Sequence, residues 1–233
     1  MRARFWTAVF AGVMLAIPVA ALGYASLQLS PRSIVLDTTH RVGQIAMSSL
    51  DAHDLIFDLE PVVWTQHGDN DSFAPTRDLI VVPPVYDVQP FRRIVVRVGL
   101  REKSSSPASE RAFQVRFREV LAPGSQWEAR VVSAPVFVAP AEKSGEVQYE
   151  LQREGETGAK LIVNDESNVH TYLGKIRVES GDQEVSSASL DEYVLSGNSR
   201  TFALQLKHPL QSGDARLTLE NADHSTTVDV PVH

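Results

Sequence analysis

The sequence contains no cysteine, so disulfide bonds and thiolate metal sites are excluded. A chain without disulfides must be stabilised by its own apolar core, and a hydrophobic share of 43% is enough to build one. The net charge of −7 argues against a protein that binds nucleic acid. No amphipathic pattern of about ten residues or more predicts a helix in either half of the chain.

Motifs that carry catalysis or phosphate binding are also absent. The chain has no G-x-S-x-G elbow, no P-loop and no G-x-G-x-x-G turn. Its seven histidines stand singly, without the spacing that lets two of them share a metal. Asp69 and Asp71 could hold a cation, but a solvated loop is the simpler interpretation. A serine, a histidine and an aspartate could still meet in space, yet the sequence predicts no enzyme, no metal site and no cofactor.

The first 25 residues have the pattern of a secretory signal peptide. Arg2 and Arg4 give it a positive start, residues 5–22 are apolar and uncharged, and Gly23 and Ala25 put small residues at the two positions that a signal peptidase reads. An uncleaved membrane anchor is the alternative, but Pro18 and the short apolar run favour cleavage. We therefore expect a protein outside the cytoplasm, with no stable membrane anchor after cleavage.

Alternation of apolar and polar residues dominates the rest of the chain and predicts short β-strands separated by turns. Pro31 interrupts the first run, so we expect the strand to kink or change sheets there, with Arg32 at the kink. Residues 140–145 have the composition of a linker, which predicts β-sandwich domains over residues 26–140 and 146–233. Residues 67–76 read as a polar loop. The expected strands are 27–37, 44–49, 55–64, 78–82, 93–100, 146–153, 159–164, 172–179, 199–206, 215–219 and 226–232.

Residues 110–140 predict a β-hairpin. Its first arm alternates apolar with polar side chains, as in a strand with one face in a core. An Ala-Pro-Gly-Ser break at residues 122–125 leads into a long second arm that contains Pro135. A proline has no N–H to give to a ladder, so this arm is expected to be an edge strand, open to another chain. The apolar positions of the first arm are Phe113, Val115 and Phe117, and the polar ones are Gln114, Arg116 and Arg118.

Several stretches together resemble the periplasmic chaperones of the chaperone–usher pilus pathway, especially the branch that serves archaic, spore-coat-like fimbriae. This resemblance implies an all-β fold of two immunoglobulin-like β-sandwich domains in a boomerang arrangement. It also implies a function without a cofactor, in which an edge strand is lent to pilus or fimbrial subunits that are then delivered to an outer-membrane usher. The stretches are LQLSPRSIVLD, VVWTQ, TRDLIVVPPVYDVQPFRRIVVRVGLR, ERAFQVRFREV and VFVAP, and more weakly NVH and YVLSGNS.

The resemblance further implies an anchor for the terminal carboxylate of the subunit. Arg32 falls on the arginine of the family's first strand, and its planar fork can donate two parallel hydrogen bonds to a carboxylate. The family's second anchor, a lysine on the lending strand, is replaced by Pro135. The nearest substitutes are Arg116, which we favour, and Arg118, for which a surface cross-strand pair is an equally good interpretation.

A charged contact between the domains is implied as well. Arg97 and Glu110 match its members in the first domain. In the second domain Asn221 fits the family's asparagine, which puts Ala222 where the acid belongs. A slip of one residue would give that role to Asp223.

The lending strand departs from the family pattern. Four residues are expected to enter the subunit, and of these only Val132 is large and apolar, while Gln126, Glu128 and Arg130 are not. Unpaired charges in an apolar core would cost several kcal/mol. The opposite parity is more apolar, so the strand either carries a β-bulge near Val131 or is atypical or degenerate. The residues taken together as the subunit-binding edge strand are Trp127, Ala129, Val131, Val132, Ala134 and Val136.

Two other functions remain alternatives. One is a secreted structural or adhesive β-sandwich protein, and the other is a degenerate chaperone paralogue that binds no client. A pilin would have one domain and an extended, alternating N-terminal segment. The two-domain layout, with Arg32 at a strand kink and an edge strand before the linker, favours the chaperone.

Overall fold

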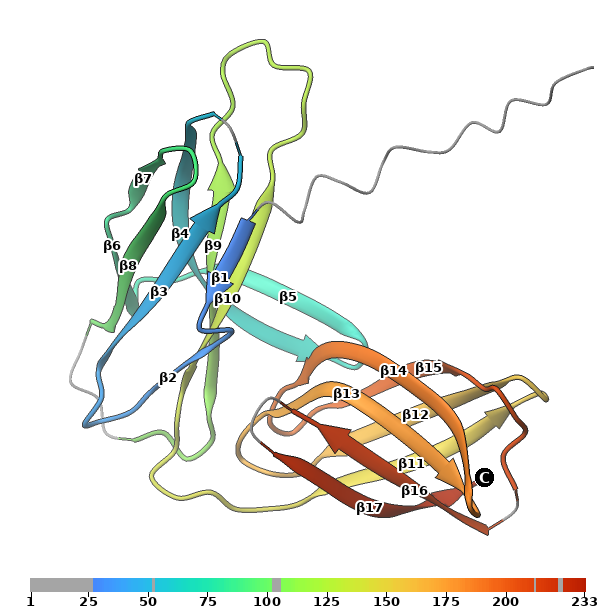
Figure 1. Cartoon of the computed structure of the whole chain (residues 1–233). Helices are drawn as coiled ribbons and strands as arrows, with labels where there is room; N and C mark the ends of the chain where they lie inside the picture. The colour runs from blue at the N-terminus through green and yellow to red at the C-terminus, as the bar shows by residue number, and fades with distance from the viewer. Residues whose placement is uncertain (1–26, 52, 102–105, 212, 222–223) are drawn as a thin grey trace, which may run out of the picture.

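The computed structural model describes residues 27–51, 53–101, 106–211, 213–221 and 224–233. Every regular element within these ranges is a β-strand, so the predicted all-β class is confirmed. The strands form two sandwiches set at an angle to each other (Figure 1). The expected signal peptide and Asp223 lie outside the described residues. Within the described ranges, no helix is long and apolar enough to cross a membrane.

The first sandwich consists of a four-stranded and a six-stranded sheet. In spatial order, the four-stranded sheet contains β1 (Leu27–Ser30), β3 (Val42–Ser49), β8 (Arg93–Leu100) and β6 (Leu79–Val82). The six-stranded sheet contains β2 (Ile34–Leu36), β10 (Val131–Val138), β9 (Arg111–Glu119), β4 (Leu55–His67) and β5 (Asn70–Pro75), with β7 (Val85–Val88) also paired to β4.

The chain changes sheets at Pro31, as predicted. β1 pairs antiparallel with β3, whereas β2 pairs in parallel with β10 of the other sheet. A proline cannot donate to either ladder, so the crossing costs no backbone hydrogen bond at that residue. Arg32 consequently lies between the two sheets, in the short link that joins β1 to β2.

The core of the first sandwich follows the alternation of the sequence. Phe113, Val115 and Phe117 of β9 are fully buried. Burying a large apolar side chain stabilises a fold by roughly 1.5–3 kcal/mol relative to leaving it exposed. Ala134 and Val136 of β10 are fully buried in the same core.

The second sandwich is one seven-stranded sheet that folds over its own core. The contact between its two halves is short, because β17 and β11 pair in register only at Val232 and Leu151. Leu151, Leu161, Ile176 and Leu217 fill the core and are fully buried. The spatial order is β14 (Gln183–Val194), β13 (Thr171–Ser180), β16 (Gly213–Glu220), β17 (Ser225–Val232), β11 (Val147–Glu154), β12 (Gly158–Asp165) and β15 (Ser199–Gln205).

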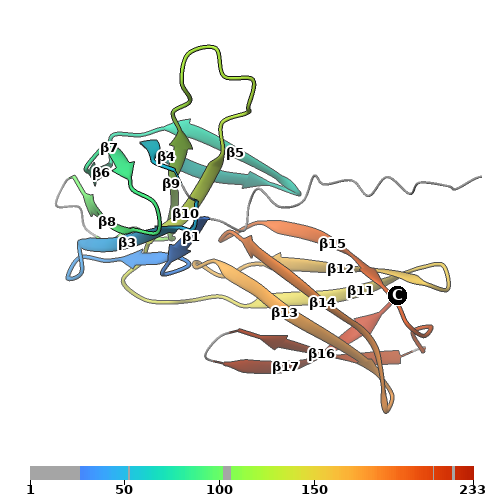
Figure 2. The ribbon, with the colours of Figure 1, turned by 45° about the horizontal axis from the view of Figure 1, so that its top comes forward.

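The polar loop expected at residues 67–76 is instead a β-hairpin that reaches the second sandwich (Figures 1 and 2). β4 turns into β5 at Gly68, whose φ of 61° favours glycine. Asp69 accepts a 2.7 Å hydrogen bond from the backbone N–H of Thr201 in the second sandwich. Asp71 accepts a 3.0 Å bond from the indole N–H of Trp64. Both aspartates therefore have a structural role in the hairpin.

Candidate functional site

β10 has one edge that is only partly paired. It pairs with β9 along its whole length, from Val131 opposite Arg118 to Val138 opposite Arg111. Its other edge pairs with β2 over Val136–Val138 only. Over residues 131–135 no strand of the described ranges pairs with that edge, so its backbone groups are open to another chain. We call these five residues the free edge.

The strand is shorter than predicted, and it differs from three of the predictions made for it. Trp127 and Ala129 precede β10, in a loop of residues 121–130, so they are not part of the strand. The ladder with β9 has no shift in register, so there is no bulge near Val131. Ala134 and Val136 are buried in the protein's own core, and Val132 packs against it. Ala134 and Val136 are thus unavailable to a partner's core, and Val132 is only half-exposed.

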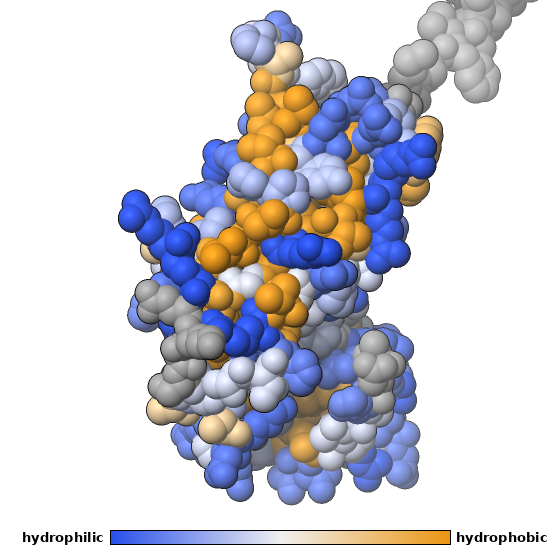
Figure 3. Space-filling view, turned by 90° about the vertical axis from the view of Figure 1, so that its left-hand side faces the viewer, coloured by the Kyte–Doolittle hydropathy of each residue, from blue (hydrophilic) through white to orange (hydrophobic). Residues whose placement is uncertain are grey.

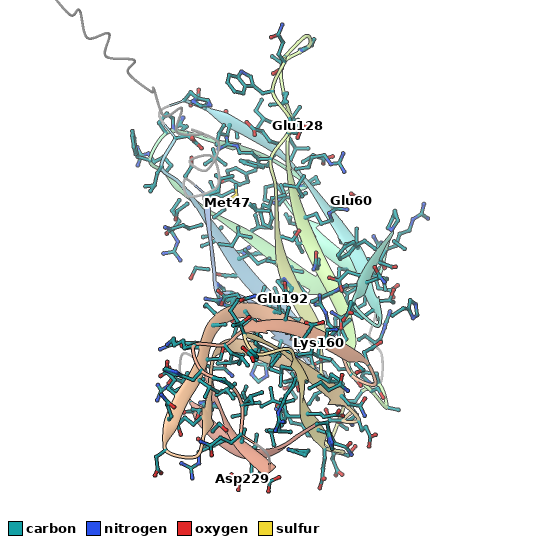
Figure 4. All side chains as sticks on the ribbon, turned by 90° about the vertical axis from the view of Figure 1, so that its right-hand side faces the viewer. Met47, Glu60, Glu128, Lys160, Glu192 and Asp229 are labelled. Atoms are coloured by element: carbon teal, nitrogen blue, oxygen red, sulfur yellow. The ribbon has the colours of Figure 1, made fainter. Side chains whose placement is uncertain are left out.

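The outer face of β10 carries Val131, Ser133 and Pro135, because the other parity faces the core. Two of the predicted anchors lie on this face of the neighbouring strand. The guanidinium of Arg116 lies over the ring of Phe73, 5.5 Å from its centroid. Each of the two arginines also faces an acid across the sheet, which is a stabilising cross-strand arrangement. Arg116 lies between Ser133 and Glu60, and Arg118 between Val131 and Asp58; Figure 4 labels Glu60 on this sheet.

Arg130 fixes the base of the loop on the core side. Its Nε donates to Glu119 Oε2 at 2.7 Å, and its Nη1 to Asp51 Oδ2 at 2.8 Å. The side chains of Arg130, Asp51 and Glu119 are only 18%, 18% and 10% exposed. Hydrogen bonds from Arg130 hold the pKa of Glu119 below its ordinary value. Arg130 is therefore bound within the first sandwich, and it does not point outward from the free edge.

Replacing Arg130 by methionine is expected to lower the free energy of unfolding by about 2 kcal/mol at pH 7, because two largely buried carboxylates lose their cation. The difference should shrink in acid. Since the pKa of Glu119 is depressed in the folded protein, its ionic bonds stabilise the fold above pH 4.5 and are lost as the pH falls below that value. Urea denaturation at pH 7 and pH 3.5 measures both effects.

The matched control for that variant is Lys160→Met, which removes a cation from an exposed pair with Glu154. Exposed pairs contribute little, so its effect should stay within about 0.5 kcal/mol at either pH. Equal losses for the two variants would contradict the role given to Arg130.

The loop of residues 121–130 presents an exposed aromatic residue beside a cavity. Trp127 is 83% exposed, at the rim of a cavity of about 970 Å³. Leu55, Ile56 and Val120 contribute apolar atoms to its wall. Figure 4 labels Glu128 of the same loop at the end of the first sandwich that is remote from the second. An exposed tryptophan next to an apolar cavity is the kind of surface on which a partner chain is held.

Arg32 lies where the first sandwich meets the second. Its Nη1 donates hydrogen bonds of 2.5 Å to the hydroxyl of Tyr172 and to Asp191 Oδ1. The Tyr172 hydroxyl in turn donates to the same Asp191 oxygen at 2.7 Å. Burial and this bond raise the pKa of Tyr172 to about 12, and the bonds from Tyr172 and Arg32 lower the pKa of Asp191. We call these three side chains the cleft triad.

The cleft triad stands at the end of the free edge. Ile34 is the first residue of β2 to pair with β10, opposite Val136. Arg32 precedes Ile34 by two residues. It therefore lies just before the pairing of β2 with β10 begins, next to the Pro135 end of the free edge. Sequence reasoning found Arg32 but missed Tyr172 and Asp191, which lie 140 and 159 residues away along the chain. No local pattern signals a pairing at that separation.

The charged contact predicted between the domains involves Glu110, as expected, but its partner in the second sandwich is His170. Glu110 accepts hydrogen bonds at Oε1 from the backbone N–H of His170, at 3.0 Å, and from its ring Nδ1, at 2.7 Å. No ion pair joins Glu110 to Arg97, although both residues are described. Arg97 lies on the outer face of the four-stranded sheet, opposite Gln44 and Val82. Figure 3 shows the apolar side chains gathered on this side of the first sandwich.

The two sandwiches are joined by an aromatic cluster. Trp64 and Phe137 from the first pack against Tyr193 and Leu195 from the second, and all four are buried. Gln66 adds two buried hydrogen bonds, donating to the Tyr193 carbonyl at 3.0 Å and accepting from the Leu195 N–H at 2.7 Å. Because the cleft triad spans both sandwiches, its geometry depends on this interface.

The sequence matches no protein-family model and no curated protein. Solved structures do resemble it. A chain of the chaperone–tip adhesion subunit complex from archaic chaperone-usher Csu pili of Acinetobacter baumannii matches with a TM-score of 0.60 at 12% identity, over 89% of this chain and 99% of that one. The CupB2 chaperone of Pseudomonas aeruginosa matches with a TM-score of 0.58 at 14% identity, over 88% and 100%.

A third similar structure is the SafA pilin–SafB chaperone complex of Salmonella enterica, with a TM-score of 0.57 at 14% identity. It covers 88% of this chain and 96% of that one. At such low identity the likeness concerns the fold. The two-domain fold implied by the sequence resemblance is therefore confirmed.

Proposed function

We propose that this protein is a chaperone that binds pilus or fimbrial subunits through the free edge of β10. The observation that carries the proposal is the juxtaposition of an unpaired strand edge with an arginine at one end of it. An exposed edge supplies backbone hydrogen bonds to an added strand, and the arginine can hold a charged group at the end of that strand. Two of the similar structures contain a chaperone together with a tip adhesion subunit or a pilin.

The direction of the added strand follows from β2. β2 runs parallel to β10 and begins its pairing at Ile34, opposite Val136. A client strand that lies along the free edge in the same direction would run from Val131 towards Pro135, so its C-terminus would meet Arg32. A terminal carboxylate at that point can accept two parallel hydrogen bonds from the guanidinium. Parallel pairing and a carboxylate anchor thus support each other.

The side chains offered to the client are those of the outer face. Arg130 is held on the core side by Glu119 and Asp51, which leaves Val131, and Trp127 in the loop before it, as the apolar groups directed to solvent. We assign Arg116 as the second basic group, because it lies opposite Ser133 of the free edge. Arg118, at the far end of that edge opposite Val131, has a weaker claim.

The cellular setting is part of the same proposal. Residues 1–25 act as a cleaved signal peptide, the mature protein works in the periplasm, and it delivers its clients to an outer-membrane usher. Residues 26–140 and 146–233 form its two domains. The alternative of a single adhesive or structural sandwich is not favoured, since the chain matches two-domain chaperones over nearly their whole length.

Co-expression with fimbrial subunits from the same genome, followed by affinity pull-down, tests the function. Replacing Arg32 by alanine is expected to reduce the amount of captured subunit by about tenfold or more, because charge-assisted hydrogen bonds contribute roughly 1.5–3 kcal/mol. The control is Arg93→Ala, which removes an exposed arginine from the four-stranded sheet and should leave capture unchanged. Full capture by the Arg32 variant would show that the cleft triad is not the anchor.

A further inference from the structure

Asp191 is aimed at Arg32 by an irregularity in the second sandwich. Leu173 of β13 faces Glu192 of β14, but the next pair along is Lys175 with Ser189. Gly174 therefore faces two residues, Leu190 and Asp191, which is a β-bulge. Asp191 has a φ of 53°, a left-handed conformation that few residues other than glycine, asparagine and aspartate adopt readily. Bulges of this kind redirect a side chain, and this one places a carboxylate against the guanidinium.

The resulting contacts use both N–H donors of Arg32 Nη1. Both bonds of Arg32 use Nη1, one to the Tyr172 hydroxyl and one to Asp191. The edge formed by Nε and Nη2 is the fork on which a second carboxylate can be received. The positive charge of that guanidinium is already balanced by Asp191. The second carboxylate would therefore lie close to the Asp191 carboxylate, on the other side of the same guanidinium. Like charges at that separation disfavour the binding of the second one.

The ion pair between Arg32 and Asp191 is nevertheless weak enough for the guanidinium to bind a second carboxylate as well. The side chains of Arg32 and Asp191 are 62% and 53% exposed, and exposed ion pairs contribute little to stability. A carboxylate at the end of a strand that is already paired with the free edge arrives at a high effective concentration. A carboxylate that is free in solution lacks this advantage and must overcome the repulsion of Asp191 unaided.

We propose that Asp191 sets the carboxylate affinity of the Arg32 site, so that only a chain terminus delivered along the free edge is retained. The inference rests on the proposed function, since it takes Arg32 to be the anchor of a client strand. It assigns to Asp191 the role of a specificity-determining residue, and to the bulge the role of holding it in place. Removing the charge of Asp191 should strengthen carboxylate binding, whereas removing a merely structural ion pair would weaken it.

The experiment compares two probes on the full mature chain by NMR titration. One probe is an N-acetylated hexapeptide of alternating valine and threonine with a free C-terminal carboxylate, and the other is the same peptide as its C-terminal amide. We expect Asp191→Asn, which keeps the left-handed conformation accessible, to lower the Kd of the carboxylate peptide by about tenfold. The Kd of the amide should not change, and Arg32→Gln should abolish the preference for the carboxylate.

The matched control is Glu192→Gln, which removes the neighbouring carboxylate. Glu192 pairs with Arg200 at 3.0 Å, so the Kd of the carboxylate peptide should change by less than about twofold. Figure 4 labels Glu192 on the side of the second sandwich that faces the first. If the wild type prefers the carboxylate but Asp191→Asn leaves the Kd unchanged or raises it, the role of Asp191 is refuted and the anchor stands. If no variant distinguishes the two peptides, the anchor and the inference both fail.

Discussion

Replacing Trp127 and Val131 together by aspartate is expected to abolish the capture of fimbrial subunits. Val131 is the first residue of the free edge and Trp127 lies in the loop before it, and a client's apolar groove would have to cover both side chains. Burying a carboxylate without a partner costs several kcal/mol, so two of them should weaken binding by more than about a thousandfold. Trp127 is 83% exposed and Val131 is half-buried, so the fold itself should tolerate the change. Pull-down from co-expressing cells measures the loss directly.

The control for this double variant is Val82→Asp. Val82 is 54% exposed on β6, in the sheet opposite to β10, and its replacement adds the same kind of charge at an exposed position away from the free edge. Capture by this variant should equal that of the wild type. If the double variant also captures subunits normally, the client does not cover the start of β10, and β10 is not the lending strand. If the wild type captures no subunit, the degenerate paralogue becomes the better hypothesis.

The fold could be predicted from the sequence because its strands are amphipathic one by one. Phe113, Val115 and Phe117 alternate with polar residues, and all three are fully buried. Pro31 marked the change of sheets correctly, since a residue without an N–H fits only where a ladder is interrupted. These signals are local, and each depends on a few neighbouring residues. The linker composition of residues 140–145 predicted two domains, and the resemblance to pilus chaperones added their immunoglobulin-like fold, which alternation alone does not specify.

The details of the site could not be predicted, because they depend on contacts between distant residues. The β4–β5 hairpin reads as a polar loop since every residue of β5 is exposed, which removes the alternation that identifies a strand. Likewise, the apolar run through Trp127 and Val131 suggested one long strand. The chain forms a loop there instead, and Arg130 holds its base against Glu119 and Asp51.

Phe137→Ala is expected to cause the largest loss of stability that we predict, and to uncouple the two sandwiches. The Phe137 ring is fully buried, with its centroid 3.6 Å from that of His170, 5.5 Å from Tyr193 and 6.2 Å from Trp64. Truncating a buried phenylalanine costs about 3–5 kcal/mol through lost burial and the cavity that remains. Since three of its aromatic contacts cross or line the interface, the loss should fall on the docking of the sandwiches.

Differential scanning calorimetry distinguishes this outcome from a uniform loss of stability. The wild type should unfold in one coupled transition, whereas the variant should show two transitions, because each sandwich keeps its own core. Phe73→Ala is the matched control, since Phe73 also stacks on Trp64, at 6.5 Å, but is 42% exposed; it should cost about 1 kcal/mol and keep a single transition. A single transition for Phe137→Ala would mean that the bonds from the Gln66 side chain to the backbone of the second sandwich, with the Glu110–His170 contact, suffice to dock the sandwiches. Two transitions would mean that the cleft triad, whose members come from both sandwiches, depends on the aromatic cluster for its geometry.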